Sequence, residues 1–299
     1  MLRATTEQDS HMSDNNDIRL FITQCYREIL NREPDIIGFE FYFRKIQNKE
    51  ISQDQLPAIF LESVEYKEIQ RKKREFDINY FEKKVYSQNG EDGILEFIFS
   101  IIGTTNKFFV EIGVGDDSEC NTRYLLEKRW DGVMIDVDAP QSSFIKKEFV
   151  TAENINELLG KYSVPVSFDL LSIDVDYNTY WIWEAIRGYC PNVVSIEYNS
   201  TIPYNESLVV KYDQMGKWDL TNYFGASLLA LSKLGKSKGY TLVGCESKGI
   251  NAFFIRNELI EGKIEMRDIK DLYRPPRFGF IVNGVYVGYS PSNKSMITV

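Results

Sequence analysis

The stretch FFVEIGVGDDSECNTRYLLEKRWDGVMIDVD, residues 108–138, decides the fold of the larger part of this chain. It opens with a short apolar run, turns through Gly113 and Gly115, and continues into a helical segment at 120–129. A second apolar run follows at 132–138. Parallel strands that are buried on both faces have this near-continuous apolar character, so the stretch predicts the strand–helix–strand unit of an α/β fold.

The same alternation covers residues 84–260. Further strand-like runs lie at 168–176 and 192–199, and amphipathic segments typical of helices at 155–162, 181–188 and 226–238. Two later runs, 240–245 and 251–257, are short enough and close enough to form an antiparallel hairpin. We therefore expect a doubly wound, mostly parallel sheet with helices on both faces, a Rossmann-like fold. Residues 261–299 form a C-terminal extension, in which FIVNGVYVGY predicts a β-hairpin turning at Asn283 and Gly284.

Residues 17–75 predict a separate, small all-α domain. Apolar residues recur at helical spacing from Ile18 to Leu30, and Pro34 ends that helix. Asp35 is positioned to cap a second helix and Ser52 to open a third. Residues 1–16 are expected to be an expression leader and a disordered N-terminus, because MLRATTEQDSHM is polar and ends in the His-Met typical of a cloning junction.

Composition excludes several kinds of chemistry. The 299 residues are 43% hydrophobic, and no run approaches the roughly 20 apolar residues that cross a bilayer, so we expect no transmembrane segment. No apolar core of a secretory signal opens the chain, which favours a cytoplasmic location. The net charge of -9 argues against nucleic acid as a partner. His11 is the one histidine and the four cysteines form no C-x-x-C pair, which removes Ser-His-Asp catalysis and histidine- or cysteine-rich zinc sites.

The glycine turn after the first strand predicts a nucleoside site. Glu111 precedes Gly113 and Gly115, and Asp136 closes the next strand. Doubly wound folds hold an adenosine in this way, with an acidic residue at the end of the second strand on the ribose. A dinucleotide site requires a third glycine, where this chain has Ser118. The E-x-G-x-G order fits S-adenosylmethionine better, because the carboxylate of Glu111 can bond into the glycine loop and order it.

Residues 84–256 resemble the class I S-adenosylmethionine-dependent methyltransferases, and most closely their FkbM-type branch. The resemblance is carried by YSQNGEDGIL (86–95), FVEIGVGDDSECNTRYL (109–125), WDGVMID (130–136), LLSIDVDYNTYWIWEAI (170–186) and VVSIEYN (193–199). It implies that Glu111, Gly113, Gly115 and Asp136 hold the cofactor. Tyr177 departs from the family, which commonly has glycine there. Residues 17–69 resemble a helical domain of unknown function found in bacterial surface-glycan and cell-envelope proteins.

A second group of polar residues follows two later strands. Asp174 and Asp176 close one of them, and Glu197 and Asn199 close the next. Residues at i and i+2 share a strand face, so each pair is expected to point the same way. Three carboxylates and an amide oxygen suit Mg²⁺, Mn²⁺ or Ca²⁺. The alternative is that Asp174 lines the cofactor site while Glu197 and Asn199 bond to loops.

These features together predict an S-adenosylmethionine-dependent O-methyltransferase acting on a sugar hydroxyl of a bacterial surface glycan or its nucleotide-linked precursor. Asp174, Asp176 and Glu197 are the candidate catalytic residues, and these three with Asn199 are the candidate ligands of Mg²⁺ or Mn²⁺. Two alternatives stay open: a catalytically degenerate nucleoside-binding module serving glycan assembly, or a metal-dependent transferase or hydrolase of nucleotide-sugars. The helical domain is the expected contact for a second copy or a glycan-assembly partner. Trp181 and Trp183 are read as helix core or, alternatively, as a platform that stacks on sugar.

Overall fold

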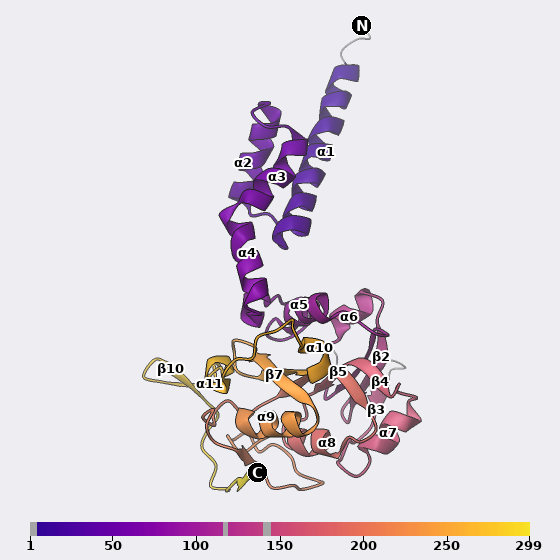
Figure 1. The fold of residues 1–299 in the computed structure, drawn as a ribbon, viewed down its shortest axis with the longest axis vertical. Coiled ribbons are helices and arrows are strands. Elements are labelled where there is room, and N and C mark those ends of the chain that lie inside the picture. Colours follow the sequence, from indigo (N-terminus) through magenta and orange to yellow (C-terminus); the bar gives the residue numbers. More distant parts are fainter. Residues whose placement is uncertain (1–4, 116–118, 140–144) are drawn as a thin grey trace. The chain divides into compact units, whose positions relative to one another are not determined.

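A computed structural model describes residues 5–115, 119–139 and 145–299. The chain divides into two compact units, residues 1–76 and residues 77–299, which we call the helical unit and the sheet unit (Figure 1). Within the described residues, none of the helices combines the length and the apolar character needed to cross a membrane.

The helical unit is built from α1 (Thr5–Leu30), α2 (Ile36–Gln47), α3 (Leu56–Glu62) and α4 (Val64–Arg74), with a 3-10 turn at Gln53–Gln55. The carboxylate of Asp35 accepts a hydrogen bond from the Gly38 amide at 2.8 Å, which confirms the expected cap of the second helix. Ser52 and Gln55 cap each other before α3. The core of the unit consists of Ile22, Tyr26, Leu56 and Phe60, each at most 3% exposed.

Helix α1 begins earlier than the sequence predicts. It starts at Thr5, inside the segment 1–16 that we expected to be a disordered leader. The described part of that segment contains neither proline nor glycine, so its backbone can continue the helix upstream of Ile18.

The sheet unit is organised around a seven-stranded sheet in the order β3-β2-β1-β4-β5-β8-β7. Strands β1 (Phe108–Ile112), β2 (Asp131–Asp136), β3 (Ile145–Lys147), β4 (Ser167–Ile173) and β5 (Cys190–Glu197) are parallel. Strand β8 (Asn251–Arg256) is antiparallel to β5 and to β7 (Tyr240–Cys245). The order reverses at β1, which has β2 on one side and β4 on the other, so the switch point lies there. The predicted parallel strands and the β7–β8 hairpin are confirmed.

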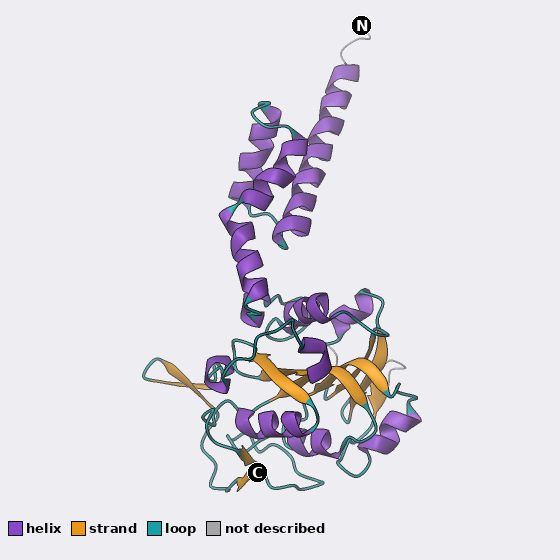
Figure 2. Ribbon diagram, in the orientation of Figure 1, coloured by secondary structure: helices purple, strands orange, loops and turns teal. Residues whose placement is uncertain are grey.

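Helices cover both faces of the sheet, as expected for a Rossmann-like fold (Figure 2). One face carries α5 (Glu91–Ile102) and α6 (Arg123–Glu127), and the other carries α8 (Thr179–Ala185) and α9 (Leu228–Ser237). Helix α7 (Ile155–Lys161) connects β3 to β4. The sheet's centre is apolar throughout: Val110, Leu171, Val194 and Phe254 are at most 1% exposed.

Shorter elements complete the sheet unit. A 3-10 turn, Ile78–Phe81, opens it, and α10 (Asn257–Ile260) and α11 (Ile269–Leu272) follow β8. Strands β6 (Leu208–Val209) and β11 (Ile297–Thr298) pair with each other. Strands β9 (Phe280–Val282) and β10 (Val285–Gly288) form an antiparallel hairpin around Asn283 and Gly284, at the position of the expected C-terminal hairpin.

Candidate functional site

Four of the residues singled out in the sequence meet in one row at the carboxyl ends of four neighbouring strands. Ile135, Ile112, Ile173 and Ile196 are register partners across β2, β1, β4 and β5. The next residue along each of these strands is Asp136, Gly113, Asp174 and Glu197, in that spatial order. In open α/β sheets, ligands bind outside the carboxyl ends of the strands at the switch point. The row therefore lies where this fold forms binding sites.

The two glycines of the turn after β1 have different surroundings. Gly113 has φ +86°, and a Cβ built on it would lie 1.5 Å from the carbonyl oxygen of Asp174, so only glycine fits between β1 and the end of β4. Gly115 has φ +58°, and a Cβ there would meet no atom of the described residues within 4 Å. Gly113 thus allows two backbones to pack closely, whereas Gly115 presents open backbone to the space above the sheet.

Glu111 orders the start of α6 from inside the protein. It is 3% exposed, and one carboxylate oxygen accepts a hydrogen bond from the Asn121 amide at 2.8 Å. The other accepts from the amide and the hydroxyl of Thr122, at 3.1 and 2.5 Å. Burial raises the pKa of Glu111 to about 7, although these three donors work against that rise. Glu111 therefore fixes the start of α6 at residues 121 and 122, whereas the sequence predicted that it bonds into the glycine loop.

The carboxylate of Asp136 accepts a hydrogen bond from the backbone of the glycine turn. Its Oδ2 accepts a hydrogen bond from the Gly115 amide at 2.8 Å, and its Oδ1 accepts from the Asp138 amide at 2.7 Å. Among the described residues, each oxygen accepts these bonds from one backbone amide, and a carboxylate oxygen can accept more than one. The loop continues through residues 116–118, which lie outside the described residues.

Three carboxylates gather at the other end of the row. Asp174, Asp176 and Glu197 each place an oxygen within 4.8 Å of the other two. Strand β4 ends at Ile173, and Asp176 has φ +57°, so a left-handed turn rather than strand alternation brings Asp176 back toward Asp174. Oε2 of Glu197 is buried and has no hydrogen-bond partner. We call these three residues the acidic triad.

Burial and the repulsion of neighbouring carboxylates raise the pKa values of all three carboxylates of the acidic triad. Burial, followed by the charges of Asp176, Glu111 and Glu91, raises the pKa of Asp174 to about 7. Burial and the two neighbouring aspartates raise the pKa of Glu197 well above its ordinary range, and burial and Asp136 raise that of Asp176. The shifts of Asp174 and Glu197 both favour the protonated, uncharged form, because two buried carboxylates lie side by side. A divalent cation coordinated here would replace protons on these carboxylates and remove the repulsion.

Asn199 does not join the acidic triad. Its side-chain amide donates to the carbonyls of Asn222 and Phe224, both at 2.9 Å. Its oxygen accepts from the amide and the hydroxyl of Thr201, at 3.1 and 2.5 Å. Because both lone pairs of this oxygen are used, Asn199 fixes the loop at 222–224 to the end of β5 and has no capacity left to bind a metal. Its expected role as a ligand is withdrawn, and the loop-bonding alternative describes it.

An aromatic cluster stands beside the acidic triad. Trp218, Phe224 and Phe278 surround the ring of Tyr289, with ring centroids 4.5, 5.9 and 5.2 Å from it. Burial, and then the charges of Glu197, Asp176 and Asp174, raise the pKa of Tyr289, because its hydroxyl lies within electrostatic reach of all three. The cluster therefore forms an apolar wall next to the carboxylates.

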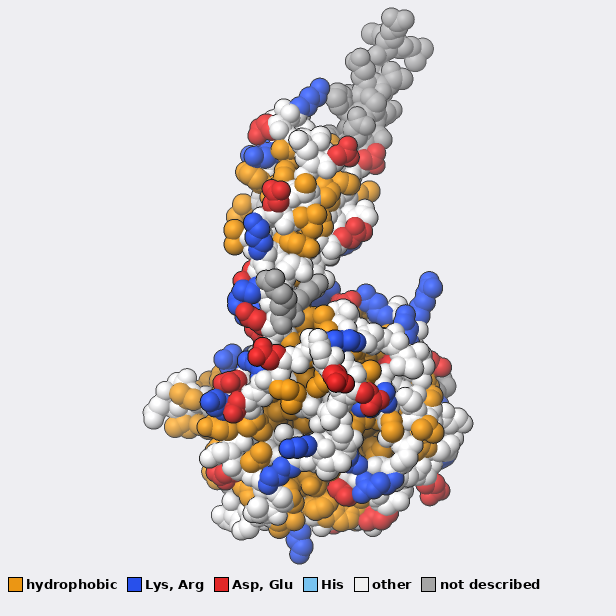
Figure 3. All heavy atoms as spheres, in the orientation of Figure 1, with side chains coloured by type: hydrophobic (Ala, Val, Ile, Leu, Met, Phe, Trp, Pro, Cys, Tyr) orange, Lys and Arg blue, Asp and Glu red, His pale blue; other side chains and the backbone are white. Residues whose placement is uncertain are grey.

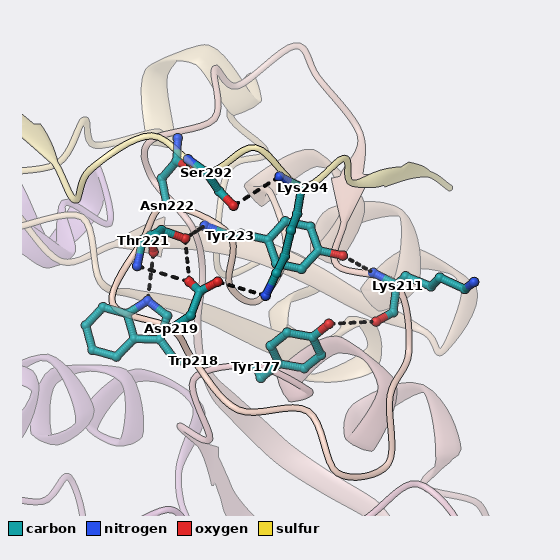
Figure 4. Close-up of polar contacts among 9 residues, drawn as sticks. All are labelled: Tyr177, Lys211, Trp218, Asp219, Thr221, Asn222, Tyr223, Ser292 and Lys294. Carbon is teal, nitrogen blue, oxygen red and sulfur yellow. Dashed lines mark hydrogen bonds and ion pairs between the residues drawn. The ribbon is translucent and has the colours of Figure 1, made fainter.

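Hydrogen bonds and an ion pair join the loop at 218–224, which carries Trp218 and Phe224, to the segment at 290–294, which follows Tyr289 (Figure 4). Asp219 pairs with Lys294 at 2.8 Å, and Asn222 accepts from the Ser292 amide at 2.8 Å. The indole of Trp218 donates to the Thr221 carbonyl at 2.7 Å, which fixes the orientation of its ring. The loop at 218–224 and the segment at 290–294 are thus held as one piece.

Sequence reasoning missed the aromatic cluster. It weighed Trp181 and Trp183 as a stacking platform, but Trp183 is 2% exposed in the core and the indole of Trp181 donates to the Val210 carbonyl. Trp218 and Tyr289 lie about 70 residues apart in irregular segments, where periodicity gives no signal. Tyr177, which departs from the methyltransferase pattern, donates its hydroxyl to the Lys211 carbonyl, and the left-handed backbone falls at Asp176 instead (Figure 4).

Comparison with known proteins bears on the helical unit. No curated protein matches the chain. Residues 2–69 match the model of a family described as a domain of unknown function, DUF4214, consistent with the helical domain expected at the N-terminus.

Proposed function

We propose that the sheet unit binds S-adenosylmethionine and transfers its methyl group to a sugar hydroxyl, with help from a divalent metal ion at the acidic triad. The observation that carries the proposal is the row at the switch point. On adjacent strands, the row brings together Asp136, an acidic residue at the position where this fold binds ribose, the glycine turn at Gly113, and the carboxylates of Asp174 and Glu197, which suit a metal ion. We infer a sugar acceptor from the resemblance of the N-terminal residues to a domain of surface-glycan proteins. This resemblance associates the chain with glycans and gives no mechanism.

The cofactor end of the row supports the nucleoside. Gly115 leaves room for a ligand to approach the backbone, and Asp136 keeps lone pairs for ribose hydroxyls while it holds the Gly115 amide. Glu111 is fully engaged at the start of α6, so its part is to fix the loop and not to touch the ligand. The cofactor would supply a methyl group activated on sulfonium.

The metal end of the row supports activation of a hydroxyl without histidine. Carboxylate oxygens are the ligands that Mg²⁺ and Mn²⁺ prefer, and Glu197 contributes a buried oxygen with no other partner. A metal held there would lower the pKa of a coordinated hydroxyl, so that an oxygen of Asp174 not bound to the metal could accept its proton. When bound, the cofactor would supply the methyl group with its C–S bond as the bond that breaks, and Asp174 would take the proton of the hydroxyl.

The aromatic cluster supports the acceptor. A sugar presents apolar C–H faces as well as hydroxyls, and the half-buried rings of Trp218 and Tyr289 offer an apolar surface within electrostatic reach of the acidic triad. A ring lying on that surface would keep one hydroxyl near Asp174 and Glu197. The wall therefore supports a ring-shaped polyol more than an open-chain acceptor.

The test is calorimetric titration of the full chain with S-adenosylhomocysteine, with and without Mn²⁺. We expect micromolar binding, loss of binding in Asp136→Ala, and retained binding in Asp176→Ala. Asp138→Ala is the matched control, because Asp138 neighbours the row but contributes only its backbone amide to Asp136. Loss of binding in Asp176→Ala and not in Asp136→Ala would reverse our assignment of the two ends of the row.

The same titration, together with an assay of methyl transfer, separates the proposed function from the two alternative functions. Binding of S-adenosylhomocysteine without methyl turnover on any glycan acceptor would favour the degenerate nucleoside-binding module. Mn²⁺ binding without S-adenosylhomocysteine binding would favour a metal-dependent enzyme acting on nucleotide-sugars. Either result would overturn the methyl-transfer proposal.

A further inference from the structure

Asn251, the first residue of β8, has a buried side-chain oxygen without a hydrogen-bond partner among the described residues. The residue is 4% exposed, and its Nδ2 donates to Oε1 of Glu91, in the first turn of α5, at 2.8 Å. A carboxylate oxygen accepts hydrogen bonds and an amide oxygen cannot donate one, so this bond fixes which end of the amide faces Glu91. Oδ1 of Asn251 is therefore directed away from Glu91.

The strand register brings Asn251 opposite a member of the acidic triad. Asn251 and Glu197 are register partners across β8 and β5. At the next position, the Tyr198 amide donates to the Ile250 carbonyl at 2.8 Å. Glu197 and Asn251 therefore form a non-hydrogen-bonded pair, the kind in which facing side chains come closest on one face of the sheet. Oε2 of Glu197 is also buried without a partner, so directly opposite residues contribute two unsatisfied oxygens.

The carboxylates around this pair lack a compensating cation. Figure 3 shows acidic and basic side chains interspersed over the drawn face of the sheet unit. Inside, across the described ranges, no lysine or arginine forms an ion pair with Glu91 or with the acidic triad. Glu91 is 0% exposed, and its charge is among those that raise the pKa of Asp174. Buried charges are normally paired or coordinate a metal ion, so this group of carboxylates favours a cation.

We propose that Asn251 supplies the fourth protein oxygen of the metal site, beside the three carboxylates of the acidic triad. Three carboxylates and one amide oxygen suit hard divalent cations such as Mg²⁺ and Mn²⁺. Asn251 thus provides the amide oxygen that the sequence assigned to Asn199. This inference rests on the proposed function, because it completes the metal site of that function.

Glu91 is a positioning residue in this arrangement. It holds the amide nitrogen of Asn251, which keeps Oδ1 on the side of Glu197. Partners that orient a metal ligand in this way typically change the metal affinity 10- to 100-fold when they are replaced. In Glu91→Gln the new amide group can donate to Oδ1 of Asn251 and turn that oxygen away from the metal. We expect Glu91→Gln to raise the dissociation constant for Mn²⁺ about 10-fold.

The experiment is calorimetric titration of the full chain with Mn²⁺ in the absence of cofactor. Asn251→Ala should raise the dissociation constant at least about 10-fold. The matched control is Asn192→Ala. Asn192 is 2% exposed, its Oδ1 also has no partner among the described residues, and its Nδ2 donates to a carboxylate oxygen of Asp169 at 2.6 Å. It lies near the start of β5, whereas Glu197 ends that strand, so its replacement should change the dissociation constant less than about twofold.

Water-proton relaxation of the Mn²⁺-loaded chain reports the contact independently of affinity. An octahedral ion that takes one oxygen from each of four residues keeps two water ligands, and one that takes three keeps three. Asn251→Ala should therefore raise the inner-sphere relaxation enhancement per bound Mn²⁺ about 1.5-fold. An unchanged enhancement would mean that Asn251 does not touch the ion and would overturn the inference even if the affinity falls.

The outcomes separate this inference from the proposed function. A wild-type chain that binds no Mn²⁺ would overturn both the inference and the metal in the proposed function. Mn²⁺ binding that is equally tight in Asn251→Ala would overturn the inference alone. Mn²⁺ binding that requires Asn251, in a chain that does not bind S-adenosylhomocysteine, would support the inference while methyl transfer fails. If Asn251→Ala does not fold, the comparison uses Glu91→Gln, and an affinity equal to that of the wild type would overturn the inference.

Discussion

Alanine at Gly113 should destabilise the sheet unit far more than alanine at Gly115, although both glycines belong to one turn and both have positive φ. A side chain at either position is forced into left-handed backbone, at a cost of about 1–2 kcal/mol. At Gly113 the added Cβ would also lie 1.5 Å from the Asp174 carbonyl oxygen, a distance that only movement of the backbone can relieve.

The movement has a definite consequence at the end of β4. Separating Gly113 from Asp174 stretches the hydrogen bond from the Asp174 amide to the Ile112 carbonyl, which measures 2.9 Å. Leaving a buried backbone group unpaired costs about 1–3 kcal/mol. Gly113→Ala should therefore reduce the free energy of unfolding by about 2–5 kcal/mol, whereas Gly115→Ala, whose Cβ meets no described atom within 4 Å, should cost about 1–2 kcal/mol.

Denaturant unfolding followed by tryptophan fluorescence measures the difference directly. All four tryptophans, at positions 130, 181, 183 and 218, lie in the sheet unit, so the signal is blind to the helical unit. Midpoints are compared at unchanged slope. If the two variants lose the same stability within about 0.5 kcal/mol, the close packing of β1 against the end of β4 is not what requires glycine at 113. Gly115→Ala should nonetheless weaken S-adenosylhomocysteine binding, since it adds a methyl group where the ligand approaches.

Three further predictions concern the acidic triad, Asn199 and the aromatic cluster. Because the pKa values of Asp174 and Glu197 are raised in the folded chain, the metal-free protein binds more protons than the unfolded chain, and its stability should fall as pH rises from about 4 to 7. Mn²⁺ should restore stability at pH 7 and above, and Asp174→Asn should raise metal-free stability there while abolishing the Mn²⁺ effect; a thermal-denaturation series over pH that stays flat would refute this. Asn199→Ala removes four hydrogen bonds and should cost about 2–4 kcal/mol in the same assay, yet leave Mn²⁺ affinity by calorimetry within about threefold; a loss as large as in Asp176→Ala would return Asn199 to the ligand set. Trp218→Ala should raise KM for a glycan acceptor at least about tenfold with a smaller effect on kcat, and Trp218→Phe should recover most of it; equal loss in both variants would mean that the indole acts only through its bond to Thr221.

The row was predictable from the sequence because parallel strands end at one edge of a sheet. Apolar runs located β1, β2, β4 and β5, and the residue after each run therefore had to fall near the others. The same logic failed at Asn199. Strand β5 ends at Glu197, so the rule that residues two apart share a face no longer applied, and the loop took Asn199 for its own hydrogen bonds.

Other features had no sequence signal to follow. Strand β3 is three residues long, too short to show a pattern. Asp176 itself has the left-handed backbone conformation that turns it toward Asp174, and this conformation is expected first of glycine or asparagine. The aromatic cluster is assembled from two irregular segments far apart in the chain, and only the folded structure brings Trp218 to Tyr289.

The loop at 218–224 and the segment at 290–294 are fastened to each other by an ion pair and by hydrogen bonds, and to the end of β5 by the side chain of Asn199. Under the proposed function, this division would make acceptor choice separable from cofactor binding. During divergence, the two segments could be exchanged together as a cassette while the row across the sheet stayed the same. A chimera that carries both segments from a relative, with Asn199 retained, is therefore the natural unit for redesigning specificity on this scaffold.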